Sequence, residues 1–333
     1  MKTRARDTRK YLLDCLDETD QDTALGRSEA KLINKALLPL SSCANYLVFH
    51  DYYTENITKL VKTQTCKKHL LCPFCASRRA AKNVKVYEEK INNFVTGRKN
   101  LIPVMITLTV KNQTDLKRVY NHMKKSFRTL MQRRRINKHN GTHPTEMRKV
   151  QGAVAAHELT FNEDNNTWHP HIHMVALLND YIDIKKLSAE WHEITGDSFI
   201  IDIRRINAKK PLKEGVSELS SGLAEVFKYA LKFSDLPQSK LWEAYKFLRG
   251  KRMVSAYGDL YGLKIPESLL DDPLKEFPYI ELFYTYSKRL KTYDLKTTKK
   301  LKSQHDQEIE NEKPREYENV PEGEGIKLNR LRI

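Results

Sequence analysis

The middle of the chain is a succession of short apolar runs separated by polar and amphipathic stretches. Four of these runs have the length and the Val, Ile and Thr content of β-strands, and they cover residues 101–110, 150–161, 168–178 and 198–206. Two stretches between them have helical composition, at residues 115–135 and 181–194. The order strand, helix, strand, strand, helix, strand is that of a ferredoxin-like (split βαβ) sheet. We therefore predict an α+β fold in which helices flank a central antiparallel sheet.

The third predicted strand begins with three histidines at alternate positions, His169, His171 and His173. Side chains at i, i+2 and i+4 of an extended strand project from one face, so the three imidazoles share a side of the sheet. Imidazoles fixed in parallel on a rigid strand are suitable ligands for a divalent cation. They could also simply line the polar face of a half-buried strand, but the strict period of two favours a metal site.

The preceding strand supplies a candidate carboxylate ligand. An Asn-Glu-Asp-Asn-Asn segment between the two strands has the composition of a turn, which predicts a hairpin. If Phe161 pairs with Trp168, Glu158 falls opposite His171 on the same face. A carboxylate beside two imidazoles gives a mixed nitrogen and oxygen site that suits Mg²⁺ or Mn²⁺ acting on phosphate. The alternative third ligand is His169.

A cysteine cluster predicts a second metal site, with structural zinc. Cys72 and Cys75 form a Cys-x2-Cys pair that offers two thiolates to one tetrahedral ion, and Cys66 lies just before them. The fourth ligand is Cys43 or His69. We favour Cys43, because a site made of four thiolates accounts for an otherwise unexplained cysteine. Clustered cysteines in a chain of this length also argue against a disulfide framework.

The charge of the chain indicates the class of its partner. Lys and Arg number 59 against 42 Asp and Glu, which gives a net charge of +17 and favours nucleic acid ahead of an anionic membrane. After the cysteines, Arg78, Arg79 and Lys82 begin a predicted basic helix that either contacts DNA or faces solvent. No stretch approaches the ~20 apolar residues of a membrane span. We therefore expect a cytoplasmic protein without a membrane partner.

A predicted helix over residues 222–233 carries a candidate nucleophile. Glu225 and Tyr229 are four residues apart and Lys232 is three residues further on, so the three share one helix face. The phenol can attack a phosphodiester, while the ammonium offsets charge and the carboxylate activates a second nucleophile. Such residues are also common on solvated helix faces. The predicted metal site on the neighbouring sheet makes this group the best catalytic candidate in the chain.

Four blocks in a fixed order carry a resemblance to a known family. They are the cysteine block with Arg78 and Arg79, the Ile-Thr-Leu-Thr-Val strand at 106–110, the His-Pro-His-Ile-His block, and Glu225, Lys228, Tyr229 and Lys232. With them the chain resembles rolling-circle plasmid replication initiators (Rep) of the HUH endonuclease superfamily. The resemblance is to the single-tyrosine type with an N-terminal cysteine block.

The resemblance implies a metal-dependent DNA nickase and strand transferase. His171 and His173 would hold the cation, and Tyr229 would attack a single-stranded DNA phosphate at a plasmid origin. The attack leaves a 5′-phosphotyrosine link and a free 3′-hydroxyl for a polymerase, and Glu225 would direct water at termination. Lys228 and the basic helix would contact DNA. The implied partners are the nick site, the origin duplex or hairpin, and a host helicase and polymerase.

These features predict five segments along the chain. They are an N-terminal arm (1–40), a zinc-binding module with the basic helix (41–98), an HUH nuclease domain (99–265), a C-terminal extension (266–286) and a charged tail, expected to be disordered (287–333). Two other functions remain open. A single-tyrosine HUH transposase would carry out the same chemistry. A zinc-dependent DNA-binding regulator would catalyse no reaction.

Overall fold

The chain folds into two compact units. A computed structural model of the protein describes residues 2–54, 56–97, 100–207, 211–213, 216–228, 233–262, 278–301 and 318–319. The first unit comprises Met1–Asp14 and Lys68–Ile265, and the second comprises Cys15–Lys67 and Pro266–Ile333. In these described ranges, no helix combines the length and the apolar character that crossing a bilayer requires.

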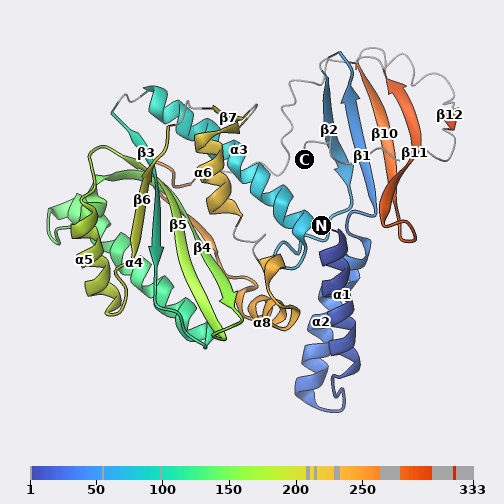
Figure 1. Cartoon of the computed structure of the whole chain (residues 1–333), viewed down its shortest axis with the longest axis horizontal. Helices are drawn as coiled ribbons and strands as arrows, with labels where there is room; N and C mark the ends of the chain where they lie inside the picture. Colours follow the sequence, from blue (N-terminus) through green and yellow to red (C-terminus); the bar gives the residue numbers. More distant parts are fainter. Residues whose placement is uncertain are drawn as a thin grey trace. The chain divides into compact units, whose positions relative to one another are not determined.

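The first unit is built on a five-stranded antiparallel sheet with the order β6-β3-β5-β4-β9 (Figure 1). Its strands are β3 (Ile102–Thr109), β4 (Val150–Asn162), β5 (Thr167–Leu178), β6 (Ile201–Arg205) and β9 (Val254–Gly258). The first four match the strands that the apolar runs predict. β9 has no continuous apolar run to predict it, because an edge strand buries too little surface to need one.

Helices cover both faces of this sheet. Phe127 of α4 packs edge-on against His157 of β4, with 5.7 Å between ring centroids, and α5 lies on α4. On the opposite face, Gly222 brings α6 close to Val175 of β5, and α3 packs on α6. The helices and short elements outside the sheet are α1 (Lys2–Asp17), α3 (Pro73–Gly97), α4 (Leu116–Asn140), η1 (Glu146–Lys149), α5 (Ile184–Thr195), β7 (Pro211–Lys213), β8 (Val216–Ser217), α6 (Glu218–Phe227), η2 (Phe233–Asp235) and α8 (Gln238–Leu248).

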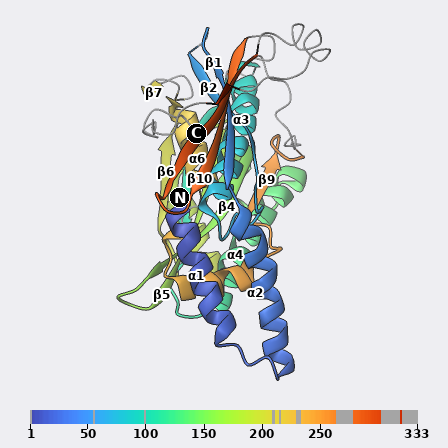
Figure 2. The ribbon, with the colours of Figure 1, turned by 90° about the vertical axis from the view of Figure 1, so that its right-hand side faces the viewer.

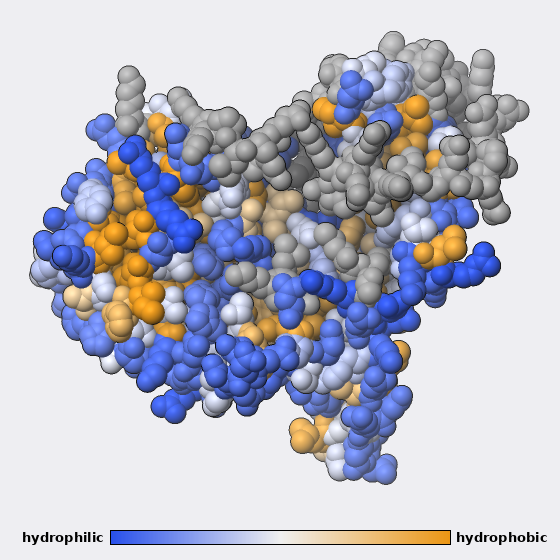
Figure 3. Space-filling model, viewed as in Figure 1, coloured by the Kyte–Doolittle hydropathy of each residue, from blue (hydrophilic) through white to orange (hydrophobic). Residues whose placement is uncertain are grey.

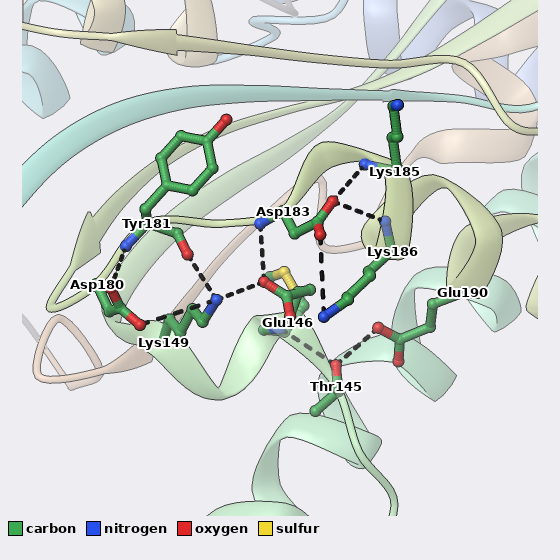
Figure 4. Close-up of polar contacts among 10 residues, drawn as sticks. Thr145, Glu146, Lys149, Asp180, Tyr181, Asp183, Lys185, Lys186 and Glu190 are labelled. Atoms are coloured by element: carbon green, nitrogen blue, oxygen red, sulfur yellow. Dashed lines mark hydrogen bonds and ion pairs between the residues drawn. The ribbon is translucent and has the colours of Figure 1, made fainter.

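A polar network fixes the base of the β4–β5 hairpin (Figure 4). The Glu146 carboxylate accepts hydrogen bonds from Lys149 Nζ at 2.6 Å and from the Asp183 backbone N–H at 2.8 Å. Asp183 in turn caps α5, and the Thr145 hydroxyl donates to Glu190 at 2.8 Å. These contacts tie the start of β4 to the segment that follows β5, so they hold the ends of the two strands together.

An apolar patch lies over α5 and β6 (Figure 3). Ile184 of α5 and Phe199 line one shallow surface hollow and are 39% and 62% exposed, and Ile200 is 61% exposed. Ile200 precedes β6, and its carbonyl accepts a hydrogen bond from the Thr109 N–H of β3 at 3.3 Å. The apolar surface therefore extends to the edge of the sheet beside the end of β3.

The second unit is built on another five-stranded antiparallel sheet, with the order β12-β11-β10-β1-β2. It contains α2 (Ala24–Ser42), β1 (Tyr46–Tyr52), β2 (Ile57–Thr63), β10 (Tyr279–Ser287), β11 (Thr292–Leu301) and β12 (Glu318–Asn319). Its strands lie side by side in Figure 1, and Figure 2 shows the sheet turned toward its edge. The unit thus joins a segment before the cysteine pair to the C-terminal part of the chain.

The prediction of a disordered tail from residue 287 is wrong for residues 292–301. They form β11, which pairs with β10 from Ser287↔Thr292 to Tyr279↔Leu301. The segment is rich in lysine and poor in apolar residues, which suggested disorder. However, Tyr293, Leu295, Thr297 and Thr298 pair with apolar and aromatic residues of β10. Likewise β1 and β2, which the sequence assigned to the zinc module at 41–98, belong to this sheet.

Candidate functional site

The β4–β5 hairpin has the register that the sequence predicts. Phe161 pairs with Trp168 and Glu158 pairs with His171, and the antiparallel ladder continues from Asn162↔Thr167 to Val150↔Leu178. Residues that are opposite in an antiparallel pair point to the same face. Glu158 therefore lies on the face of the sheet that carries His171 and His173.

Three side chains converge on this face as a candidate metal site. Ligand atoms of Glu158, His173 and Glu225 all lie within 4.8 Å of one another. Glu158 is fully buried, and its Oε2 is 3.6 Å from Nε2 of His173. A buried carboxylate is costly unless a positive charge or hydrogen bonds compensate it, and a cation between these groups would do so. Two carboxylates and an imidazole are a donor set that suits Mg²⁺ or Mn²⁺.

Two threonines of β3 orient the histidine rings. Thr107 Oγ1 is 3.2 Å from Nδ1 of His173, and Thr109 Oγ1 is 3.3 Å from Nδ1 of His171. Each threonine is the cross-strand partner of its histidine. Because these contacts occupy Nδ1, Nε2 is the nitrogen left for a cation. Nε2 of His173 is buried and makes no hydrogen bond with any residue that the structure describes, which fits a ligand position.

His171 and His169 continue the row along β5. The centroids of the His171 and His173 rings are 5.8 Å apart, and those of His169 and His171 are 4.2 Å apart. The compact group includes Glu225 and neither His171 nor His169. The His171 ring is oriented like that of His173 but lies two residues away from it along β5. Whether His171 belongs to the set of ligands therefore stays a proposal.

His157 is on the other face, as the regular alternation of β4 predicts. It is 3% exposed and packs edge-on against Phe127, while its Nδ1 lies 3.3 Å from the Met253 carbonyl oxygen. Burial lowers the pKa of His157 to about 4, so the ring is neutral near pH 7. It is a core residue and takes no part in the metal site.

Helix α6 brings Glu225 to the sheet. Ser217 caps the helix, and Glu88 of α3 accepts hydrogen bonds from the hydroxyls of Ser217 and Ser220. Lys228 forms an ion pair with Glu225 across one helical turn. Tyr229 and Lys232, the predicted nucleophile and its charge partner, lie outside the described residues.

Sequence reasoning missed two features of this site. It placed Glu225 in the catalytic group but not beside the metal ligands, because helix-on-sheet packing is set by tertiary contacts. It also included Thr107 and Thr109 only as members of the Ile-Thr-Leu-Thr-Val strand and gave them no role. A Thr-x-Thr strand that pairs with a His-x-His strand is the signal that would have predicted these contacts.

The four predicted zinc ligands come together. The sulfur atoms of Cys43, Cys66, Cys72 and Cys75 lie within 4.8 Å of one another, and all four residues are buried. Cys43 Sγ accepts a hydrogen bond from the Cys66 N–H at 3.3 Å. Four thiolates in one cluster are the donor set of a structural zinc site. His69 does not belong to this group and instead lies 3.3 Å from the Arg79 guanidinium.

The predicted basic helix is present as α3, and its three candidate DNA-contact residues differ in exposure. Arg79 is exposed, whereas Arg78 and Lys82 are half-buried. The Arg78 guanidinium lies over the Phe74 ring, 5.9 Å from its centroid. The role of the three residues in DNA binding stays a proposal.

Substituting Cys72 with serine is expected to remove bound metal from the cysteine cluster. A hydroxyl is a poor zinc ligand, and thiolate sites of this type hold the ion with roughly 10 to 16 kcal/mol in small domains. Elemental analysis of the purified protein should show about one zinc per chain in the wild type and little in the variant. Cys15→Ser is the matched control, since Cys15 lies outside the cluster. Stoichiometric zinc in the Cys72 variant would rule out this site.

Comparisons with known proteins agree with one another. A family model described as "Replication protein" matches residues 57–320. A "Protein rep" of Bacillus sp is 29% identical over 220 residues, which cover 59% of this chain and 66% of that protein. A "Protein rep" of Bacillus amyloliquefaciens is 28% identical over 220 residues, covering 59% and 60%. A "Protein rep" of Staphylococcus aureus is 26% identical over 210 residues, covering 59% and 82%.

The matched regions cover less than two thirds of the length of the two Bacillus proteins. No solved structure was found to match this chain.

Proposed function

We propose that this chain, which belongs to the replication protein family, initiates plasmid replication. In this proposal it nicks single-stranded DNA at the origin. The observation that carries the proposal is the cluster of Glu158, His173 and Glu225 on one face of the sheet. Their ligand atoms are close enough to share one cation, and Tyr229 follows in the chain just after the end of α6, which supplies Glu225.

The fold of the first unit is proposed to be that of an HUH nuclease. Four of its strands have the order β6-β3-β5-β4, all antiparallel, and the chain passes through them as strand, helix, strand, strand, helix, strand. A ferredoxin-like sheet has this order and connectivity. The histidines lie on a central strand, where both neighbouring strands contribute side chains to the site.

The proposed chemistry is transesterification at one phosphate. The Tyr229 oxygen attacks phosphorus and forms a P–O bond as the bond to the 3′ oxygen breaks. The phenolic proton is lost, the 3′ oxygen gains one, and the 5′ side stays linked to the tyrosine. A divalent cation bound by His171, His173 and Glu158 would polarise the scissile phosphate and stabilise its developing charge. Lys232 and Lys228 would offset phosphate charge.

Glu225 has a proposed role in releasing the covalent link. Its carboxylate lies beside the candidate ligands and pairs with Lys228. From there it can accept a proton from a water or a 3′-hydroxyl that attacks the phosphotyrosine. Rejoining uses the 3′-hydroxyl and release uses water, so one carboxylate serves both outcomes.

The proposed partners follow from this chemistry. They are the single-stranded nick site and the origin duplex or hairpin, with Arg78, Arg79, Lys82 and Lys228 as DNA contacts, and a host helicase and polymerase that extend from the 3′-hydroxyl. A single-tyrosine transposase would have the same site. Genetic context separates the two, because an initiator gene lies beside a replication origin and a transposase gene lies between element ends.

The experiment that tests the function is covalent trapping. The full chain is incubated with Mn²⁺ and single-stranded oligonucleotides tiled over its own locus, and adducts are resolved by denaturing electrophoresis. We expect an adduct on one oligonucleotide and none in EDTA. Absence of an adduct on every oligonucleotide would favour the non-catalytic regulator.

Replacing Glu225 with glutamine separates its two possible roles. If Glu225 acts on the attacking water, the variant forms the adduct at about the wild-type rate, and hydrolytic release slows at least about a hundredfold. Adduct formation and decay are followed on one oligonucleotide at fixed Mn²⁺. Glu243→Gln, which removes an exposed carboxylate of α8, is the control. A variant that needs much more Mn²⁺ to form the adduct would instead make Glu225 a metal ligand.

A further inference from the structure

The turn between β10 and β11 is an exposed cluster of cations around an apolar tip. It contains Lys288, Arg289, Leu290 and Lys291, and all four residues are exposed. Leu290 is 59% exposed, and its backbone N–H donates to the Ser287 hydroxyl at 3.3 Å. We call residues 288–291 the basic wing. A single exposed leucine is common on a protein surface, so the distinctive feature of this turn is the concentration of three cations around it.

The basic wing extends beyond the neighbouring strand. β10 pairs with β1 only up to Tyr46↔Thr285, and the last backbone contact is from Tyr286 N–H to the Asn45 carbonyl at 2.9 Å. Residues 287–292 continue past that point as a two-stranded hairpin, drawn in orange and red in Figure 1. Their side chains are therefore available to a partner that approaches this end of the sheet.

The base of the hairpin is held in place by two tyrosines. Tyr286 and Tyr293 are cross-strand partners whose rings meet edge to face at 5.2 Å. The Tyr293 hydroxyl also donates to the Ala44 carbonyl at 2.5 Å. A hairpin anchored in this way presents its tip in a defined direction, which lowers the conformational entropy that a binding surface loses on association.

The charge of the basic wing selects a polyanion. Three of its four residues are cationic, and none of them forms an ion pair with a residue that the structure describes. A protein partner would have to supply three carboxylates in a small area, whereas duplex DNA presents a phosphate every ~1.7 Å of its axis. An apolar residue among arginine and lysine at a hairpin tip also matches a wedge between base steps.

We propose that the basic wing binds double-stranded DNA of the origin, with its cations on phosphates and Leu290 in a groove. The inference rests on the proposed function, because it takes a replication origin as the partner. It assigns duplex recognition to the second unit and single-strand chemistry to the first. The two activities then depend on different residues and are separable by mutation.

The test compares two variants that each remove three positive charges from the full chain. One carries Lys288→Ala, Arg289→Ala and Lys291→Ala, and the control carries Lys31→Ala, Lys35→Ala and Lys185→Ala on exposed helix positions. Affinity is measured by fluorescence anisotropy for duplexes of about 30 base pairs, or roughly three helical turns, tiled over the protein's own locus at several salt concentrations. Covalent trapping on single-stranded DNA and zinc content are measured in parallel.

We expect the wing variant to bind the tightest locus duplex at least about tenfold more weakly. The slope of log affinity against log salt should fall in magnitude by about 2 to 3, because each lost phosphate contact removes about 0.9. Leu290→Ser should weaken binding without changing the slope. Adduct formation on single-stranded DNA should stay at the wild-type level in both.

The proposal is overturned if the wing variant binds duplexes as the control does, an outcome that would leave a protein as the partner. It is also overturned if the wing variant loses adduct formation together with duplex binding. If the wild type forms no adduct but wing variants still lose duplex affinity, the nicking function fails while the wing stands as a DNA-binding surface.

Discussion

Replacing Tyr229 with phenylalanine is expected to abolish the covalent adduct with single-stranded DNA. The change removes one oxygen atom, and that oxygen is the proposed nucleophile. Without it, no bond to phosphorus can form, so the loss should be at least about a thousandfold and limited only by detection. The measurement is adduct yield over time on the oligonucleotide that the wild type attacks, at saturating Mn²⁺.

Tyr261→Phe is the matched control for this substitution. Tyr261 is 76% exposed and belongs to the same unit as Tyr229, and no role is predicted for its hydroxyl. The control therefore removes the same atom at a position where no effect on the adduct is expected. The Tyr229→Phe variant should still bind the oligonucleotide and Mn²⁺ normally. An adduct that forms equally in both variants would show that another residue is the nucleophile.

Replacing His173 with alanine should reduce the rate of nicking by about a thousandfold, or about 4 kcal/mol of transition-state stabilisation. His173 is the histidine whose Nε2 lies 3.6 Å from the buried Glu158 carboxylate, with its Nδ1 held by Thr107. Its loss would remove one proposed ligand and leave the Glu158 carboxylate with weaker compensation. Single-turnover kinetics measures the loss of nicking rate, and calorimetric titration with Mn²⁺ measures the loss of cation affinity.

His169→Ala tests the ligand set with the same chemical change. His169 lies at the far end of the histidine row, next to His171 and outside the compact group. We expect its loss to reduce nicking less than about tenfold and to leave Mn²⁺ affinity unchanged. If His169→Ala weakens Mn²⁺ binding as much as His173→Ala does, His169 takes the third ligand position from Glu158.

The β4–β5 hairpin could be predicted from the sequence because the residues that determine its register are close together along the chain. A strand has a side-chain period of two, and a short turn fixes the register of its two strands. The pairing of Phe161 with Trp168 therefore determines that of Glu158 with His171, and the structure has both pairs. The choice of Cys43 over His69 also agrees with the cysteine cluster.

Contacts between distant segments could not be predicted in the same way. The approach of Glu225 to Glu158 depends on how α6 packs on the sheet, where Gly222 permits close contact with Ile206 and Val175. The pairing of β10 with β1 joins segments that are far apart in the sequence, as in Tyr46↔Thr285. Neither contact leaves a periodic signal in the sequence. The expectation for β11 was wrong for a different reason, because β11 forms a local hairpin with β10 but its lysine-rich composition suggested disorder.

The residue that carries the covalent link to DNA can be identified directly. The Mn²⁺-dependent adduct is digested with nuclease and trypsin, and the peptide that retains a nucleotide is identified by mass spectrometry. We predict a phosphodiester on Tyr229, linked to the 5′ side of the nick, and no modified peptide when EDTA replaces Mn²⁺. A nucleotide on any other residue, or an adduct that forms equally without a divalent cation, would contradict the proposed mechanism.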